Sequence, residues 1–120
     1  MSNGWIGVDF DGTLSIDMGR DKPPGPPVRP VLDLVKELLA HGHDVRIFTA
    51  RCFDGTTPIH QELAKVREWC LVWIGQQLPI TNVKDHHMNI LLDDRAISVN
   101  KNAGNLAGFR STDWWNVGAL

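Results

Sequence analysis

Short apolar runs recur along the chain and predict the strands of a buried sheet. The first run, residues 5–9, is almost continuously apolar, which is typical of a parallel strand covered on both faces. Runs at residues 78–83 and 88–92 and a shorter one at 45–48 predict further strands, and residues 96–99 predict a fifth that could lie at an edge. The sequence therefore predicts a mostly parallel sheet.

Two segments between these runs carry apolar residues at three- and four-residue steps, which predicts amphipathic helices. The first extends from residue 28 to about residue 41, with Gly42 as its C-cap. The second covers residues 58–77, with Thr57 as its N-cap and Pro58 at its first position. Strands that alternate with helices in this way predict β-α-β units with right-handed crossovers.

The remaining segments differ in character from these strands and helices. Residues 15–30 hold most of the prolines, including Pro-Pro-Gly-Pro-Pro at 23–27, and predict neither helix nor central strand. This segment is either a stiff surface connection or a short flap over the site, and both can hold, because a loop that leaves the first strand passes that end of the sheet. In the tail, residues 101–120, we expect one of Trp114 and Trp115 to pack on the domain and the other to contact a partner or a second subunit.

Composition limits the class of protein. The chain has 120 residues, 42% hydrophobic and 22% charged, which indicates one globular domain over residues 1–120. The net charge of −2 gives no electrostatic case for nucleic-acid or membrane binding by the whole surface. Cys52 and Cys70 lack metal-ligand spacing, and no signal peptide or membrane span is evident, so we expect reduced thiols and a cytoplasmic protein.

Polar residues stand where three of the predicted strands end. Asp9 and Asp11 come at the end of the first run, Thr49 follows the second, and Asp93-Asp94 follow residues 88–92. The carboxyl ends of parallel strands meet at one edge of a sheet, where α/β proteins build active sites. Side chains at i and i+2 share one face of an extended chain, so Asp9 and Asp11 can converge. Two carboxylates this close favour a cation or a proton between them, and Mg²⁺ prefers such oxygen ligands.

The order of these residues resembles the four motifs of the haloacid dehalogenase (HAD) superfamily of phosphotransferases. The string DFDGTL at residues 9–14 matches its DxDx(T/V) motif, and Thr49, Lys84 and Asp93-Asp94 match the strand-end Ser/Thr, the lysine and the acidic pair. The resemblance covers roughly residues 4–99. It implies an α/β fold, a three-layer α/β/α Rossmann-like (HAD-type) domain with a mostly parallel sheet. The short intervals between the motifs leave no room for a large cap domain.

The resemblance also implies roles for the acidic residues. Asp9 would be the nucleophile that forms an aspartyl-phosphate, and Asp11 would be the general acid and base. Mg²⁺ would be held by Asp9, by the backbone carbonyl of Asp11 and by the acidic pair, with Asp93 as the direct ligand and Asp94 acting through water.

Two further positions are expected to contact phosphoryl oxygens, Thr49 through its hydroxyl and Lys84 through its charge. Lys84 stands only nine residues before Asp93, and Arg51 is the alternative cation, which could instead bind a distal group of the substrate. With Lys84 in this role, Lys84→Ala should cost more activity than Arg51→Ala. The expected substrate-binding residues are Gly12, Thr13, Ala50 and Arg51.

The function that follows from the resemblance is a Mg²⁺-dependent phosphatase that hydrolyses a phosphomonoester of a small metabolite or nucleotide. One alternative is a non-catalytic phosphate-binding or interaction module on the same scaffold. Another is a polynucleotide 3′-phosphatase or phosphotransferase, because an open site without a cap can admit a nucleic-acid end. Homo-oligomerisation is a further way to close such a site over a small substrate. No membrane association is expected.

Overall fold

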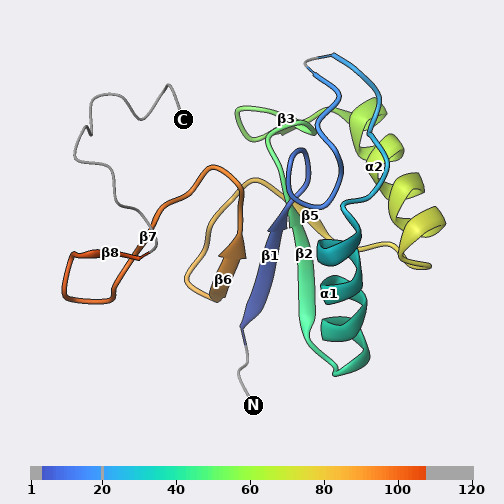
Figure 1. The fold of residues 1–120 in the computed structure, drawn as a ribbon. Helices are drawn as coiled ribbons and strands as arrows, with labels where there is room; N and C mark the ends of the chain where they lie inside the picture. The colour runs from blue at the N-terminus through green and yellow to red at the C-terminus, as the bar shows by residue number, and fades with distance from the viewer. Residues whose placement is uncertain (1–3, 20, 108–120) are drawn as a thin grey trace.

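The computed structural model describes residues 4–19 and 21–107, which form a mixed α/β fold around one parallel sheet (Figure 1). The strands of this sheet are β1 (Trp5–Asp9), β2 (Asp44–Phe48), β5 (Ile80–Thr81) and β6 (Met88–Leu92). Their order is β5-β2-β1-β6, and every neighbouring pair is parallel. The predicted mostly parallel sheet is therefore confirmed, and its two central strands, β1 and β2, both come from the N-terminal half of the chain.

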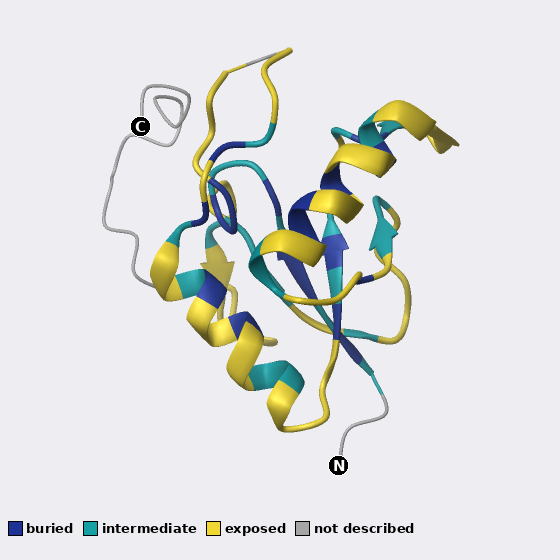
Figure 2. Cartoon of the chain, turned by 90° about the vertical axis from the view of Figure 1, so that its right-hand side faces the viewer, coloured by how far each residue is buried: buried dark blue, intermediate teal, exposed yellow. Residues whose placement is uncertain are grey.

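Two helices, α1 (Arg29–Ala40) and α2 (His60–Trp73), lie on the same face of this sheet (Figures 1 and 2). The core lies between the helices and the sheet. Its fully buried members include Val8 and Ile47 from the strands, Val35 from α1 and Val66 from α2. No described helix has the length and apolar character needed to cross a membrane.

The described residues form two layers, so the expected third layer is not found among them. The link from β5 to β6 spans only residues 82–87 and contains no helix. Successive side chains of a strand point to opposite faces of the sheet, so Trp5 and Val8 of β1 lie on opposite faces. Val8 faces the helices, and Trp5 points to the face that the helices leave open. The guanidinium of Arg46 lies 4.9 Å from the centre of the Trp5 ring. The indole N–H of Trp5 donates a 2.8 Å hydrogen bond to Asp85. Polar side chains rather than a helix thus cover this tryptophan.

The second helix begins later than the sequence predicts. Thr57–Pro58 form a short strand, β4, that pairs antiparallel with β3 (Phe53–Asp54). Gly55 turns this hairpin at φ +60°, and α2 begins at His60 with Ile59 as its N-cap. The predicted cap at Thr57 is wrong because that residue belongs to a hairpin, whose pairing depends on contacts that a helix-capping pattern does not report.

The C-terminal end of α1 agrees with the sequence prediction, whereas that of α2 does not. Gly42, at φ +84°, follows the C-cap of α1, and the His43 amide donates to the Leu38 carbonyl, as in a Schellman motif. Helix α2 ends at Trp73, earlier than residue 77. Gly75 at φ +92° then turns the chain toward β5.

Two predicted strands differ in extent or place. The run at 78–83 forms only the two-residue β5. Within residues 96–99, only β7 (Ser98–Val99) is a strand, and it pairs antiparallel with β8 (Leu106–Ala107) in a hairpin separate from the main sheet. Trp114 and Trp115 lie outside the described residues.

The proline-rich segment forms an arm that we call the flap, residues 15–19 and 21–27. Its two sides pair at the base, where Ser15 and Pro27 form an antiparallel bridge and the Ile16 amide donates to the Pro26 carbonyl at 2.8 Å. Trp69 of α2 donates its indole N–H to the Gly25 carbonyl at 2.7 Å. A Cβ at Gly25 would collide with the Ile16 carbonyl, so the two sides approach as closely as they do only because this residue is glycine.

Candidate active site

A tight turn after β1 positions the first two carboxylates. The Phe10 carbonyl accepts hydrogen bonds from the amides of Leu14, at 3.0 Å, and Ser15, at 2.9 Å. The Phe10 ring is fully buried and packs edge-to-face on Trp69, with ring centres 5.1 Å apart. Because the residue between Asp9 and Asp11 is anchored in the core, both aspartates are held at the carboxyl end of β1.

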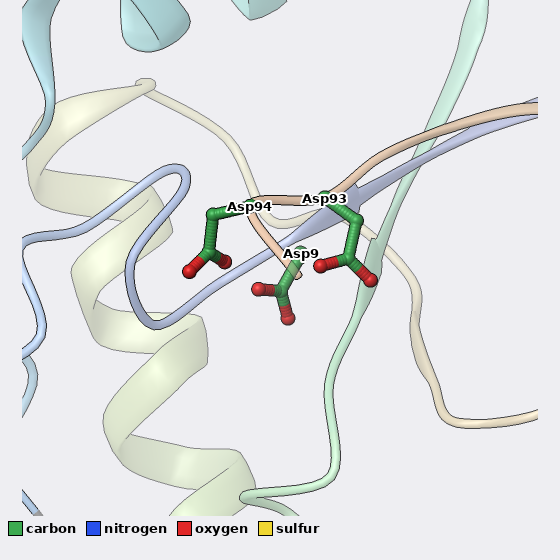
Figure 3. Close-up of side chains that lie close together, drawn as sticks. All are labelled: Asp9, Asp93 and Asp94. Carbon is green, nitrogen blue, oxygen red and sulfur yellow. The ribbon is translucent and has the colours of Figure 1, made fainter. Parts of the chain in front are cut away.

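Three carboxylates gather at this edge of the sheet, as Figure 3 shows. Asp9 ends β1, and Asp93 and Asp94 follow β6, the neighbouring parallel strand. One oxygen atom from each of the three lies within 4.8 Å of the others. Carboxylate oxygens converging from two strands fit the ligand preferences of Mg²⁺, which binds through one or two carboxylates and retains water.

The electrostatics of this cluster differ between its members. Burial raises the pKa of Asp9 to about 7, and a hydrogen bond to Asp94 and the charges of Asp93 and Asp94 add to the effect. Burial acts in the same direction on Asp94, but its hydrogen bonds with Asp9 and Thr13 lower its pKa overall. Without a cation, the cluster is therefore stabilised when a proton lies between Asp9 and Asp94.

Gly12 and Thr13 support the carboxylates rather than line the cavity described below. The Thr13 hydroxyl donates to Asp94 Oδ1 at 2.9 Å, lies 3.4 Å from Asp9 Oδ2 and accepts the Asp94 amide at 3.0 Å. Gly12 has φ +89°, and a Cβ on it would lie 2.7 Å from Asp94 Oδ2. The DGT part of the motif thus fixes the position of Asp94, a residue 81 positions beyond Thr13.

Gly12→Ala is expected to displace Asp94 and to destabilise the fold by about 1–3 kcal/mol, since the added Cβ meets a carboxylate and a left-handed φ is unfavourable for alanine. Denaturant unfolding measures the loss, and a Mg²⁺ titration should show weaker binding. Gly42→Ala is the matched control, because Gly42 also has positive φ but no neighbour within 4 Å. Equal effects of the two variants on Mg²⁺ binding would contradict the contact with Asp94.

The raised pKa of Asp9 predicts that the metal-free protein loses stability as the pH rises. A carboxyl group whose pKa is raised by folding stabilises the fold below its unfolded pKa and loses this contribution as pH passes from about 4 to about 7. After allowance for solvent screening and for the opposite pKa shift of Asp94, we expect the free energy of unfolding to fall by about 1–2 kcal/mol over this pH range. Unfolding in EDTA from pH 4 to pH 8 measures it. Asp9→Asn should remove this component, and an unchanged pH dependence in that variant would contradict the assignment.

A cavity of about 720 Å³ opens beside the carboxylates. It receives residues from the ends of β1 and β2, from the flap, from the start of α2 and from the segment after β6. Its lining consists of Asp9, Asp11, Asp17, Gly19, Asp21, Phe48, Thr49, Ala50, Arg51, Ile59, Glu62, Asp93 and Arg95. The structure therefore brings together most of the predicted site: Asp9, Asp11, Thr49, Ala50, Arg51 and Asp93.

The two predicted cations lie in different environments. Arg51 lines the cavity and forms a bidentate ion pair with Asp11, with Nε 2.9 Å from Oδ2 and a terminal nitrogen 2.8 Å from Oδ1. This pair raises the pKa of Arg51. Lys84 is exposed, lies in the link between β5 and β6 and is not part of the cavity lining. Thr49 is buried, and its hydroxyl accepts the Arg51 amide at 3.2 Å.

Sequence reasoning missed several residues that line the cavity. Asp17 and Asp21 come from the flap, and Glu62 comes from the first turn of α2. The expectation of a flap over the site was the available signal for the first two. Nothing local in the sequence marks Glu62, because it reaches the site only through the packing of α2 on the sheet.

These features define a class of protein: a mixed α/β domain with a carboxylate-rich cavity at the carboxyl edge of a parallel sheet. No protein-family model matches the chain, and no curated protein matches it. It is similar to the solved structure of a conserved protein coded by a locus from Bacteroides thetaiotaomicron, with 21% sequence identity and a TM-score of 0.57. The match covers 78% of this chain and 77% of that one, so the similarity extends over most of the fold.

Proposed function

We propose that this chain is a small, capless member of the HAD superfamily with a Rossmann-like core, and that it is a Mg²⁺-dependent phosphatase. The observation that carries the proposal is the placement of Asp9: it shares a cavity with a second carboxylate, Asp11, and contributes to a three-carboxylate cluster suited to a divalent cation. The proposed substrate is the phosphomonoester of a small metabolite or nucleotide, since about 720 Å³ is typical of a small-molecule site.

In the proposed first step, a carboxylate oxygen of Asp9 attacks phosphorus and the bond from phosphorus to the leaving oxygen breaks. Asp11 gives its proton to that oxygen. In the second step, Asp11 removes a proton from a water molecule, the water oxygen bonds to phosphorus, and the bond from phosphorus to Asp9 breaks. Inorganic phosphate leaves, and both aspartates return to their starting states.

The residues around Asp9 have supporting roles in this proposal. Asp9, Asp93 and the Asp11 carbonyl would hold Mg²⁺, with Asp94 acting through water. The ion would supply positive charge to the phosphoryl oxygens when bound. The Thr49 hydroxyl, which lies in the cavity lining, would donate to a phosphoryl oxygen.

Because Arg51 lines the cavity and Lys84 does not, we now expect the opposite order for their alanine variants. Arg51→Ala is expected to lower hydrolysis at least tenfold, because it removes the partner of a cavity carboxylate. Lys84→Ala is expected to stay within about twofold of the unmodified protein, as substitutions of exposed side chains away from a site usually do. Steady-state rates of both variants measure this. A larger loss for Lys84→Ala would return the phosphoryl-binding role to that residue.

The test of the proposed function is hydrolysis of 4-nitrophenyl phosphate by the pure protein with Mg²⁺, with EDTA, and with Asp9→Asn as the contamination control. Activity that requires both the metal and Asp9 supports the phosphatase. Absence of turnover combined with Mg²⁺-dependent binding of inorganic phosphate would instead favour a non-catalytic phosphate-binding module.

A further inference from the structure

The guanidinium of Arg51 lies at the junction of three separate segments. Besides its bidentate pair with Asp11, it donates to the Lys22 carbonyl of the flap at 2.8 Å and lies 3.4 Å from Glu62 Oε2 of α2. Only 13% of the Arg51 side chain is exposed, compared with 25% for Asp11. This arginine therefore connects the turn after β1, the flap and α2 at the wall of the cavity.

Each nitrogen of this guanidinium already has an acceptor. Nε and one terminal nitrogen donate to the two oxygens of Asp11, and the other terminal nitrogen donates to Lys22 and faces Glu62. These contacts use four of the five N–H groups of the guanidinium, so a phosphoryl oxygen could receive one hydrogen bond from it but not a bidentate pair unless one of these contacts is broken. Arginine presents its donors in a rigid planar fork, so a bidentate pair fixes both the position and the rotation of the carboxylate.

We propose that Arg51 is a positioning residue that orients Asp11 for proton transfer. The inference rests on the proposed function, in which Asp11 is the general acid and base. As the base, Asp11 is the ionised carboxylate paired with Arg51; as the acid, it carries its proton on one oxygen and keeps the Arg51 hydrogen bond on the other. The inference assigns Arg51 an action through Asp11 instead of a direct contact with the phosphoryl group.

The dependence of the rate on the leaving group separates these two roles. An alkyl phosphate needs a proton on its leaving oxygen, whereas 4-nitrophenyl phosphate releases a stable anion without one. Loss of a phosphoryl contact would slow both substrates by the same factor, but misplacement of Asp11 would slow the alkyl ester more. The informative quantity is the ratio of kcat/KM for glycerol 1-phosphate to kcat/KM for 4-nitrophenyl phosphate, because kcat/KM reports the reaction up to release of the leaving group and not the later breakdown of the aspartyl-phosphate that both substrates share.

Arg51→Lys keeps the positive charge but loses the fork, and we expect it to lower this ratio by about 30–100-fold, less than the roughly 10²–10⁴-fold that complete loss of general acid catalysis would cost. The matched control is Arg46→Lys, because Arg46 forms a similar bidentate pair with Asp44, with contacts of 3.2 Å and 2.8 Å, outside the cavity lining. Arg46→Lys should leave the ratio unchanged. Circular dichroism and the thermal midpoint check that both variants are folded.

A second measurement places Arg51→Lys in the Asp11→Asn background. If Arg51 acts through Asp11, the ratio in the double variant should equal that of Asp11→Asn alone, because the residue to be positioned has already lost its function. An equal loss on both substrates in Arg51→Lys, or a further fall of the ratio in the double variant, would overturn the inference while leaving the phosphatase in place. Failure of the unmodified protein to hydrolyse 4-nitrophenyl phosphate would overturn the proposed function and this inference with it.

Discussion

Asp9→Asn is expected to abolish phosphate-ester hydrolysis, with a loss of kcat on the order of 10⁴-fold or more, as for removal of a catalytic nucleophile elsewhere. The amide oxygen of asparagine is a far weaker nucleophile than a carboxylate, and the aspartyl-phosphate could not form. The fold should remain intact because asparagine has nearly the shape of aspartate. At pH 8 without metal, the variant should be at least as stable as the unmodified protein, since it removes the charge repelled by Asp93 and Asp94.

The measurement is the steady-state rate with Mg²⁺ for both proteins, prepared in parallel, together with denaturant unfolding. Asp33→Asn is the control, because Asp33 is exposed on α1 and does not line the cavity. It should retain full activity. Full activity in Asp9→Asn would remove the covalent mechanism, and an unfolded Asp9→Asn protein would show that the residue has a structural role instead.

The part of the site that the sequence predicts well is the part built from strand ends. The runs ending at Asp9 and before Asp93 are short and apolar, and both form strands of the expected length, β1 and β6, that are direct neighbours in the sheet. In a parallel sheet the carboxyl ends share one edge, so residues more than 80 positions apart are brought together by a local pattern and one topological rule. The cluster of Asp9, Asp93 and Asp94 follows from this rule.

The parts that could not be predicted depend on tertiary contacts. Thr57 and Pro58 carry a helix-start pattern, but pairing with Phe53–Asp54 places them in a hairpin. Lys84 comes at the expected place in the order of the motifs along the chain. That order does not predict where its side chain lies, because Lys84 is part of an exposed six-residue link between β5 and β6. Conversely, the fork of Arg51 reaches Asp11, 40 positions away, only because β1 and β2 are adjacent.

Asp11→Asn is expected to slow both steps, each by about 10²–10⁴-fold for an alkyl ester, because asparagine can neither donate a proton to the leaving oxygen nor accept one from water. With 4-nitrophenyl phosphate the first step needs no acid, so only the breakdown of the aspartyl-phosphate should slow strongly. A phosphorylated enzyme should then accumulate, and 4-nitrophenol should appear in a burst of about one equivalent followed by a slow phase.

Rapid mixing with 4-nitrophenyl phosphate and mass spectrometry of the acid-quenched protein test this expectation, with the phosphoryl group located on Asp9. The control is Asp44→Asn, which breaks the similar bidentate Asp–Arg pair on β2 but involves no residue of the cavity lining, so it should show no burst. The burst distinguishes a role of Asp11 in proton transfer from a role in substrate binding. Loss of a residue needed only for binding would raise KM, but the aspartyl-phosphate would not accumulate. Unimpaired turnover of both substrates by Asp11→Asn would remove Asp11 from proton transfer, and Arg51 would then have no acid or base to position.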